Sequence, residues 1–162
     1  MAAPVVLESV GRLQVSTPTS SDLRLYQEVS IAKVKDFFSQ GLNRIVYVGP
    51  VGMGKTKVAE EIIIRTLAAS EDVNVWFLAH RVALLEQPAR RFKHRGIPFG
   101  MVKAGSKPAS KHRVQIASVQ TLANREVDEQ RGRGRICLVF VDEGHRTKAA
   151  TYLKILRDLK RT

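Results

Sequence analysis

The sequence predicts an α/β domain in which a mostly parallel sheet is covered by helices on both faces. Short β-branched or apolar runs alternate with segments of helical character, the order typical of such domains. The stronger runs are apolar at consecutive positions, as expected for strands buried on both faces. A glycine-rich turn also separates one predicted strand from the helix after it. With 162 residues, the chain has room for one domain with a substantial core.

The first helix is expected to follow a loose N-terminal arm. Residues 16–21 are rich in Ser and Thr with one Pro, so residues 1–21 are assigned to the arm and regular structure is expected to begin near Asp22. Asp22 is interpreted as the N-cap of this helix, and Gly41 as its stop. The helical spacing is carried by Leu25, Val29, Ala32 and Phe37.

Beyond Gly41, predicted strands and helices alternate. Strands are predicted at residues 44–48, 73–78, 99–102, 114–117 and 136–141. Helices are predicted at residues 57–69, 81–93, 119–124 and 148–160, and an Arg- and Gly-rich loop precedes the last strand. Pro88 falls inside the second of these helices, where it should kink the helix or start a new segment.

The charge balance favours a polyanionic partner. The formal net charge is +12, from 27 Lys and Arg against 15 Asp and Glu. The basic residues cluster in 90–95, 103–113 and 125–135, outside the apolar runs, a distribution suited to tracking a nucleic-acid backbone. Plain solubility is the alternative explanation of this charge.

No feature predicts export or membrane insertion. No apolar stretch approaches the length of a membrane span, and the N-terminus lacks the basic segment and the apolar run of a signal peptide. We therefore expect a cytoplasmic or nucleoid-associated protein. The single cysteine, Cys137, lies in an apolar run and is interpreted as a small buried residue rather than a catalytic thiol.

A phosphate-binding loop is predicted between the strand at 44–48 and the helix at 57–69. The pattern G-x-x-x-x-G-K-[ST] is matched by Gly49, Pro50, Val51, Gly52, Met53, Gly54, Lys55 and Thr56. Its glycines let backbone N–H groups surround phosphate oxygens at the N-terminus of a helix. Lys55 is expected to contact the β- and γ-phosphates of ATP, and Thr56 to hold Mg²⁺.

An acidic pair follows the last predicted strand. Residues 136–141 place Asp142 and Glu143 at the carboxyl end of a buried strand, where ligands bind in parallel sheets. ATP hydrolysis needs a second carboxylate for magnesium and a group that orients the attacking water. Asp142 fits the first role and Glu143 the second. Two acids in a capped turn are the structural alternative.

Four further stretches stand in a definite order around the loop. They are Leu23–Gln27, Leu78–Arg81, Ile116–Leu122 and the box Asp142–His145. From residue 22 onward, the chain thereby resembles the first RecA-like domain of superfamily 2 helicases, in the branch that contains the helicase subunit of type III restriction enzymes. The phosphate loop and the acidic box are the specific parts of this resemblance.

The resemblance implies roles for residues outside the loop. Gln27 would read the adenine of ATP, although an ordinary solvated helix residue is the alternative. Arg81, Ser118 and Thr121 would contact a nucleic-acid backbone without regard to sequence, with DNA favoured over RNA, and a helix-surface role is the alternative for Arg81. His145 would link the ATP site to the nucleic acid.

The sequence also departs from the family pattern. Gly144 replaces the usual alanine and Val51 the usual threonine, and the loop also resembles that of AAA+ ATPases. In the family, a further strand lies between the strands of the phosphate loop and the acidic box, and a second RecA-like domain follows. We therefore expect a truncated domain, or a sheet that closes differently. An AAA+ ATPase fragment and a nucleic-acid-binding regulator without turnover are the alternative functions.

Overall fold

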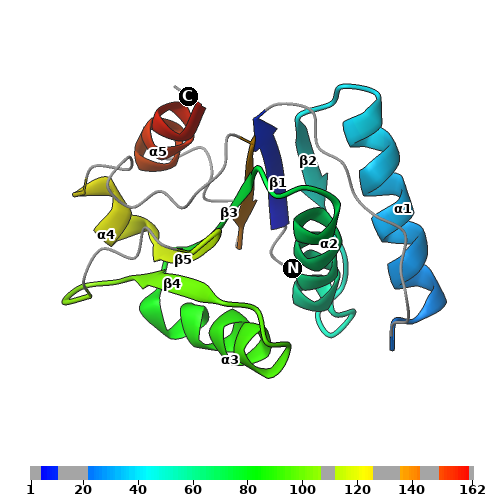
Figure 1. Ribbon diagram of the computed structural model, residues 1–162, viewed down its shortest axis with the longest axis horizontal. Helices are drawn as coiled ribbons and strands as arrows, with labels where there is room; N and C mark the ends of the chain where they lie inside the picture. The colour runs from blue at the N-terminus through cyan, green and yellow to red at the C-terminus, as the bar shows by residue number, and fades with distance from the viewer. Residues whose placement is uncertain (1–4, 11–21, 107–111, 126–135, 143–149, 161–162) are drawn as a thin grey trace.

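The computed structural model describes residues 5–10, 22–106, 112–125, 136–142 and 150–160, which form a six-stranded sheet with helices on both faces (Figure 1). The strands are β1 (Val5–Val10), β2 (Arg44–Tyr47), β3 (Val73–Ala79), β4 (Phe99–Val102), β5 (Val114–Ser118) and β6 (Ile136–Val141). The helices are α1 (Leu25–Ser39), α2 (Lys55–Ala69), α3 (Glu86–His94), α4 (Val119–Ala123) and α5 (Ala150–Lys160), with a 3₁₀ turn η1 at Val82–Leu85.

The sheet is mostly parallel, which confirms the predicted fold class. The strand order is β2-β1-β6-β3-β5-β4. Strands β6, β3, β5 and β4 pair in parallel, whereas β1 runs antiparallel to both of its neighbours, β2 and β6. Because β2 and β6 are both antiparallel to β1, they are parallel to each other, and their carboxyl ends lie at the same edge of the sheet.

Two apolar cores lie on opposite faces of the sheet. One packs α1, α2 and α3 against the sheet through residues such as Ile31, Ile62 and Phe92. The other packs α4 and α5 against it, and Figure 1 shows these two helices on the far side from α1 and α2. All seven residues of β3 are buried, with Phe77 in the first core and Trp76 in the second. Burial on both faces explains the consecutive apolar residues of this strand.

The expectation that structure begins near Asp22 is wrong, because residues 5–10 form β1. This strand occupies the position between β2 and β6 that the family resemblance left open. Val6 and Leu7 face opposite cores, and the buried Glu8 carboxylate lies 3.3 Å from the guanidinium of Arg44. The sheet therefore closes through an antiparallel N-terminal strand.

The first helix differs from its prediction in start and orientation. It begins at Leu25, so the N-cap position is Arg24 rather than Asp22. Its buried side is formed by Gln27, Ile31, Val34 and Phe38, whereas the predicted apolar positions Leu25, Val29 and Phe37 are exposed. The stop at Gly41 is correct, since this glycine has φ +85° just beyond the helix.

The helix predicted at residues 81–93 is divided in two. The turn η1 comes first, and α3 then begins at Glu86 with Pro88 in its first turn. A proline there loses no intrahelical hydrogen bond, because the first N–H groups of a helix have no partner within it. For the last helix, the predicted residues 148 and 149 lie outside the described part of the chain. No helix among the described residues is long and apolar enough to cross a membrane.

Candidate nucleotide-binding site

The phosphate loop lies where the sequence predicts it, between the end of β2 and the start of α2. Gly52 and Gly54 adopt φ angles of +84° and +81°, which other residues rarely adopt. At Gly49, a Cβ atom would overlap Sδ of Met53, so a larger residue there would require the Met53 side chain to move. The glycines therefore allow a tight loop that leads into the N-terminus of α2, the position at which helices bind phosphate.

The Lys55 side chain folds over this loop. Its ammonium donates to the carbonyl oxygens of Gly49 at 2.9 Å and Pro50 at 3.0 Å. These bonds hold a positive charge against the loop, while Thr56 follows in the first turn of α2. An anion bound by the loop N–H groups would lie beside this ammonium.

Two neighbouring side chains of α1 hold the tip of the loop. The amide Nε2 of Gln27 and the hydroxyl of Tyr26 each donate to the carbonyl oxygen of Met53 at 3.0 Å. Gln27 is only 4% exposed, so it is not the solvated helix residue considered as the alternative. Tyr26 stood in the stretch that carried the resemblance, but its contact with Met53 had no signal in the sequence.

Asp142 follows β6 at the same edge of the sheet as the loop. Its backbone N–H donates to the carbonyl of Leu78 at 2.9 Å, which continues the pairing of β6 with β3. Thr56 and Asp142, the two predicted magnesium ligands, thus follow strands whose carboxyl ends share one edge. Glu143, Gly144 and His145 lie outside the described residues.

The predicted nucleic-acid contacts extend along this edge. Ala79 and Ser118 are register partners at the ends of β3 and β5, so Arg81 and Thr121, which follow these strands, lie on the same side. Arg81 is exposed and Thr121 partly exposed, whereas Ser118 is buried. Oγ of Ser118 and Nδ1 of His80 are buried without a hydrogen-bond partner among the described residues. His80 is a candidate that the sequence did not single out.

The family of the chain follows from a comparison with known proteins. A family model described as "Type III restriction enzyme, res subunit" matches residues 20–162. The chain belongs to this family. It is therefore a RecA-like domain of the superfamily 2 helicase type, an ATP-binding class of domain.

Curated relatives of this helicase-type domain include phage and restriction proteins. A 51.5 kDa protein of Lactococcus phage (isolate 7-9) is 34% identical over 65% of the chain. The type I restriction enzyme EcoAI endonuclease subunit of Escherichia coli is 31% identical over 78% of the chain, and the EcoKI subunit of strain K12 is 28% identical over 76%. The chain spans 20%, 16% and 12% of these three relatives, in the order given.

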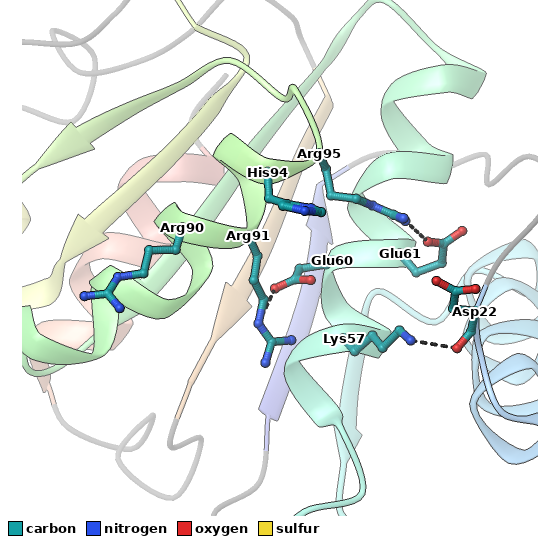
Figure 2. A pocket seen from close by; sticks show the side chains of 8 residues that line it. All are labelled: Asp22, Lys57, Glu60, Glu61, Arg90, Arg91, His94 and Arg95. Carbon is teal, nitrogen blue, oxygen red and sulfur yellow. Dashed lines mark hydrogen bonds and ion pairs between the residues drawn. The ribbon is translucent and has the colours of Figure 1, made fainter.

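Some basic residues of the helicase-type domain form ion pairs within the fold. Arg91 and Arg95 of the α3 segment reach across to α2, where Arg91 Nε lies 3.5 Å from Glu60 and Arg95 Nη2 lies 2.8 Å from Glu61 (Figure 2). They line a pocket of about 460 Å³ together with Asp22, Lys57, Glu60, Glu61, Arg90 and His94. Arg91 therefore lies in α3, within the helix predicted at residues 81–93, and Arg95 directly follows α3.

The Arg113 side chain also forms hydrogen bonds within the fold. Its guanidinium donates to the backbone carbonyls of Val73 at 3.1 Å, Leu67 at 3.4 Å and Ser70. These carbonyls lie at the C-terminal end of α2 and the start of β3, the opposite edge of the sheet from the phosphate loop. Arg113 belongs to the basic cluster 103–113 that was expected to track a nucleic acid, but its position does not favour a phosphate contact. Lys107 and Lys111 lie outside the described residues.

Proposed function

We propose that the chain is the ATP-binding domain of a DNA or RNA helicase or translocase, which binds ATP with magnesium and the backbone of a nucleic acid. One observation carries the proposal: the phosphate loop, with Lys55 folded over it, opens at the same sheet edge as Asp142. Membership of a helicase-type family supports it.

The residues present fit a magnesium nucleotide. Gly52 and Gly54 adopt the φ angles of a loop that turns its N–H groups inward, and Lys55 supplies a cation beside it. A hydroxyl and a carboxylate, from Thr56 and Asp142, are oxygen ligands of the kind that Mg²⁺ prefers. In the proposed site, Lys55 neutralises the terminal phosphates and Glu143 orients the water. Bound magnesium would supply the charge that stabilises the transferring phosphoryl group.

The nucleic acid is proposed to cross the carboxyl edge near β3 and β5. Arg81 supplies an exposed cation there, and the buried Ser118 Oγ and His80 Nδ1 atoms have no hydrogen-bond partner within the part of the chain that the structure describes. Buried polar atoms in proteins normally have partners, so such atoms at one edge favour a ligand. Phosphate contacts of this kind carry no sequence information, and we expect binding to be largely sequence-independent.

Turnover by the 162-residue chain alone is expected to be slow. In phosphoryl transfer, an arginine finger from a second domain or partner raises the rate by about a thousandfold or more. The chain has room for only one domain of this kind. We therefore propose that full activity needs a second RecA-like domain.

The test measures nucleotide binding and turnover separately. Lys55→Ala should abolish binding of ATP with magnesium, whereas Glu143→Gln should leave binding intact and remove residual hydrolysis, because only the lysine contacts phosphate. Lys33→Ala, at an exposed lysine of α1, is the matched control and should change neither quantity. Equal loss of binding in the first two variants would contradict the proposed roles. Absence of ATP binding by the native chain would favour a nucleic-acid-binding regulator instead.

A further inference from the structure

The pocket between α2 and α3 contains no residue of the phosphate loop or of α1. One wall is α2 from Lys57 to Glu61, and the other is the α3 segment from Arg90 to Arg95 (Figure 2). Asp22 lies beside Lys57, whose Nζ donates to its carbonyl oxygen at 2.7 Å. The volume of about 460 Å³ lies within the range usual for small-molecule sites, roughly 300–1,000 Å³. The pocket therefore has room for a ligand of its own.

The Glu61 carboxylate of this pocket is paired with two arginines. Its Oε1 accepts from Arg65 Nε at 2.9 Å, and its Oε2 accepts from Arg95 Nη2 at 2.8 Å. Arg65 is 5% exposed and also donates to both oxygens of Glu28 on α1, at 2.8 and 3.0 Å. Because both of its oxygens accept from charged donors, Glu61 adds little repulsion toward an anion in the pocket.

Two further arginines of α3 are paired only loosely. Arg91 Nε lies 3.5 Å from Glu60 Oε1, and Arg90 Nη2 lies 3.6 Å from Glu86 Oε2. Both separations exceed the usual N–H···O distance of about 2.7–3.2 Å. The Arg90 and Arg91 side chains are also 82% and 46% exposed. A guanidinium has five N–H donors in a planar fork that matches phosphate oxygens, so these two groups can donate to a ligand.

Glu60 gives the pocket a buried group without a hydrogen-bond partner. It is 7% exposed, and its Oε1 accepts no hydrogen bond from the described residues. Figure 2 shows its carboxyl directed from α2 toward α3. Burial raises the pKa of Glu60 to about 7, so the carboxyl is partly protonated at neutral pH and can then donate its O–H. A buried polar atom normally has a partner, which favours a ligand here.

We propose that the pocket between α2 and α3 is a second anion site, which takes a small phosphate-class oxyanion. Arg90 and Arg91 donate N–H groups to the anion oxygens, and the protonated Glu60 carboxyl donates its O–H. The ion pair of Arg95 with Glu61 holds the two walls together around them. Free phosphate and a small phosphomonoester share this chemistry. The site does not depend on the proposed binding of ATP, because the two share no residue.

Binding of an anion should be linked to uptake of a proton. A bound anion favours the protonated form of Glu60, since it repels the carboxylate. The charged and titratable groups that line the pocket with Glu60 are Asp22 before α1, Lys57 and Glu61 on α2, and Arg90, Arg91, His94 and Arg95 of the α3 segment. A histidine ordinarily changes charge between about pH 5 and 8, so His94 should act in the same direction as Glu60.

Calorimetric titrations at constant ionic strength test the site. The protein is the 162-residue chain with Lys55→Ala, which removes the cation of the phosphate loop. The ligands are sulfate, whose charge is constant between pH 6 and 8, inorganic phosphate, ribose 5-phosphate and ribose. Arg91→Ala and the milder Arg90→Ala are added in turn. Lys93→Ala is the matched control, because it removes a positive charge from the same helix at an exposed position outside the pocket.

Sulfate and phosphate should each bind at one saturable site. Arg91→Ala should weaken both by about tenfold or more, and Arg90→Ala by about threefold or more, because each removes charged donors. Lys93→Ala should change either constant by less than about twofold. Tighter binding of ribose 5-phosphate than of phosphate, with no binding of ribose, would identify a phosphomonoester as the occupant. Equal affinity would identify free phosphate, and both results support the site.

The proton linkage has its own variant. Native Glu60 should make sulfate binding tighter at pH 6 than at pH 8. Glu60→Gln keeps an N–H donor but does not ionise, so it should tighten sulfate binding at pH 8 by up to about tenfold and change it little at pH 6. A Glu60→Gln variant with the full pH dependence of the native residue would overturn the role of this carboxyl as a donor.

Three results would overturn the site itself. They are absence of saturable binding of sulfate and phosphate, equal weakening by Lys93→Ala and Arg91→Ala, and displacement of phosphate by an unphosphorylated single-stranded oligonucleotide. The last would assign the pocket to a nucleic-acid track. Thermal unfolding of each variant separates loss of the fold from loss of the site, and Arg90→Ala, at an exposed residue, keeps the test decisive if Arg91→Ala does not fold. Failure of the native chain to bind ATP would count against the proposed function alone.

Discussion

The carboxylate of Glu60 lies 3.5 Å from Nε of Arg91, across the interface between α2 and α3 (Figure 2). Glu60 is 7% exposed, and this burial raises its pKa from 4.5 to about 7 despite the opposing effect of Arg91. The cations Arg95 and Lys57 also oppose the shift without cancelling it. Glu60 is therefore partly protonated at neutral pH in the folded chain.

This ionisation predicts a pH-dependent stability. The folded pKa lies above the unfolded one, so the folded state binds more protons between about pH 4.5 and 7. The contribution of Glu60 is present below about pH 4.5 and is lost as the pH rises through about 7. Glu60→Gln should therefore raise the free energy of unfolding at pH 8, by at most about 3 kcal/mol, and change it little at pH 4.

Urea unfolding at the two pH values checks this prediction. Glu86→Gln is the matched control, because Glu86 is exposed and its ion pair with Arg90 spans 3.6 Å at the surface. The control should leave the pH dependence unchanged. A loss of stability at pH 8 in Glu60→Gln would mean that the pair with Arg91 outweighs the cost of burial.

Arg113 should matter for folding more than for nucleic-acid binding. Arg113→Ala removes donors from the carbonyls at the end of α2 and the start of β3. Because hydrogen bonds from charged groups are worth about 1.5–3 kcal/mol each, the free energy of unfolding should fall by at least about 2 kcal/mol. Urea unfolding measures the loss. Lys103→Ala, at an exposed site, is the control and should cost little. Comparable stability of the two variants would show that these bonds contribute nothing.

Nucleic-acid binding should weaken steeply with salt. A surface that makes three or four phosphate contacts loses roughly tenfold or more in affinity between 50 and 200 mM salt. Reversal of Lys103, Lys107 and Lys111 to glutamate should weaken binding of a labelled single strand more than reversal of Lys33, Lys35 and Lys154, which lie on α1 and α5. Fluorescence titration at both salt concentrations decides between a localised track and diffuse charge. Equal losses in the two triple variants would favour diffuse charge.

The strand β1 should control nucleotide affinity as well as stability. Leu7 is 2% exposed in the core, so Leu7→Ala should lower the free energy of unfolding by about 2–5 kcal/mol. Among the described strands, β2 pairs only with β1, so loosening β1 should also weaken ATP binding by the loop that follows β2. Leu153→Ala, at a half-exposed residue of α5, is the control. Leu7→Ala could instead lower the free energy of unfolding and still bind ATP with native affinity at temperatures where it is folded. That result would show that β1 controls stability but not nucleotide affinity.

Local patterns were sufficient for most of the sheet and for the phosphate loop. Trp76 and Phe140 lie in strands that are covered on both faces, so consecutive residues of these strands are apolar. Such apolar runs can be read directly from the sequence. The strand β1 was missed because Glu8 interrupts its apolar run, and its burial beside Arg44 depends on a residue far along the chain. No local pattern reports such a partner.

The orientation of α1 shows the same limit at the site. Gln27 is buried because it bonds Met53 and the start of its own helix, so a polar residue occupies a position that periodicity assigns to an apolar one. The sequence pointed to Gln27 as a functional residue through the family resemblance. The sequence did not indicate that the Gln27 amide is hydrogen-bonded to the loop, because that contact exists only after α1 packs beside α2.

The pairing of β1 has a consequence for biosynthesis. Among the described strands, β1 is the first to emerge from the ribosome and β6, with which it pairs from Val6↔Val141 to Val10↔Cys137, is the last. When the phosphate loop has emerged from the ribosome, β6, the neighbour of β1 on the side away from β2, has not yet been synthesised. The loop is therefore anchored to the rest of the sheet only after β6 has emerged, and shorter ribosome-bound intermediates are expected to expose an unpaired β1 edge to chaperones.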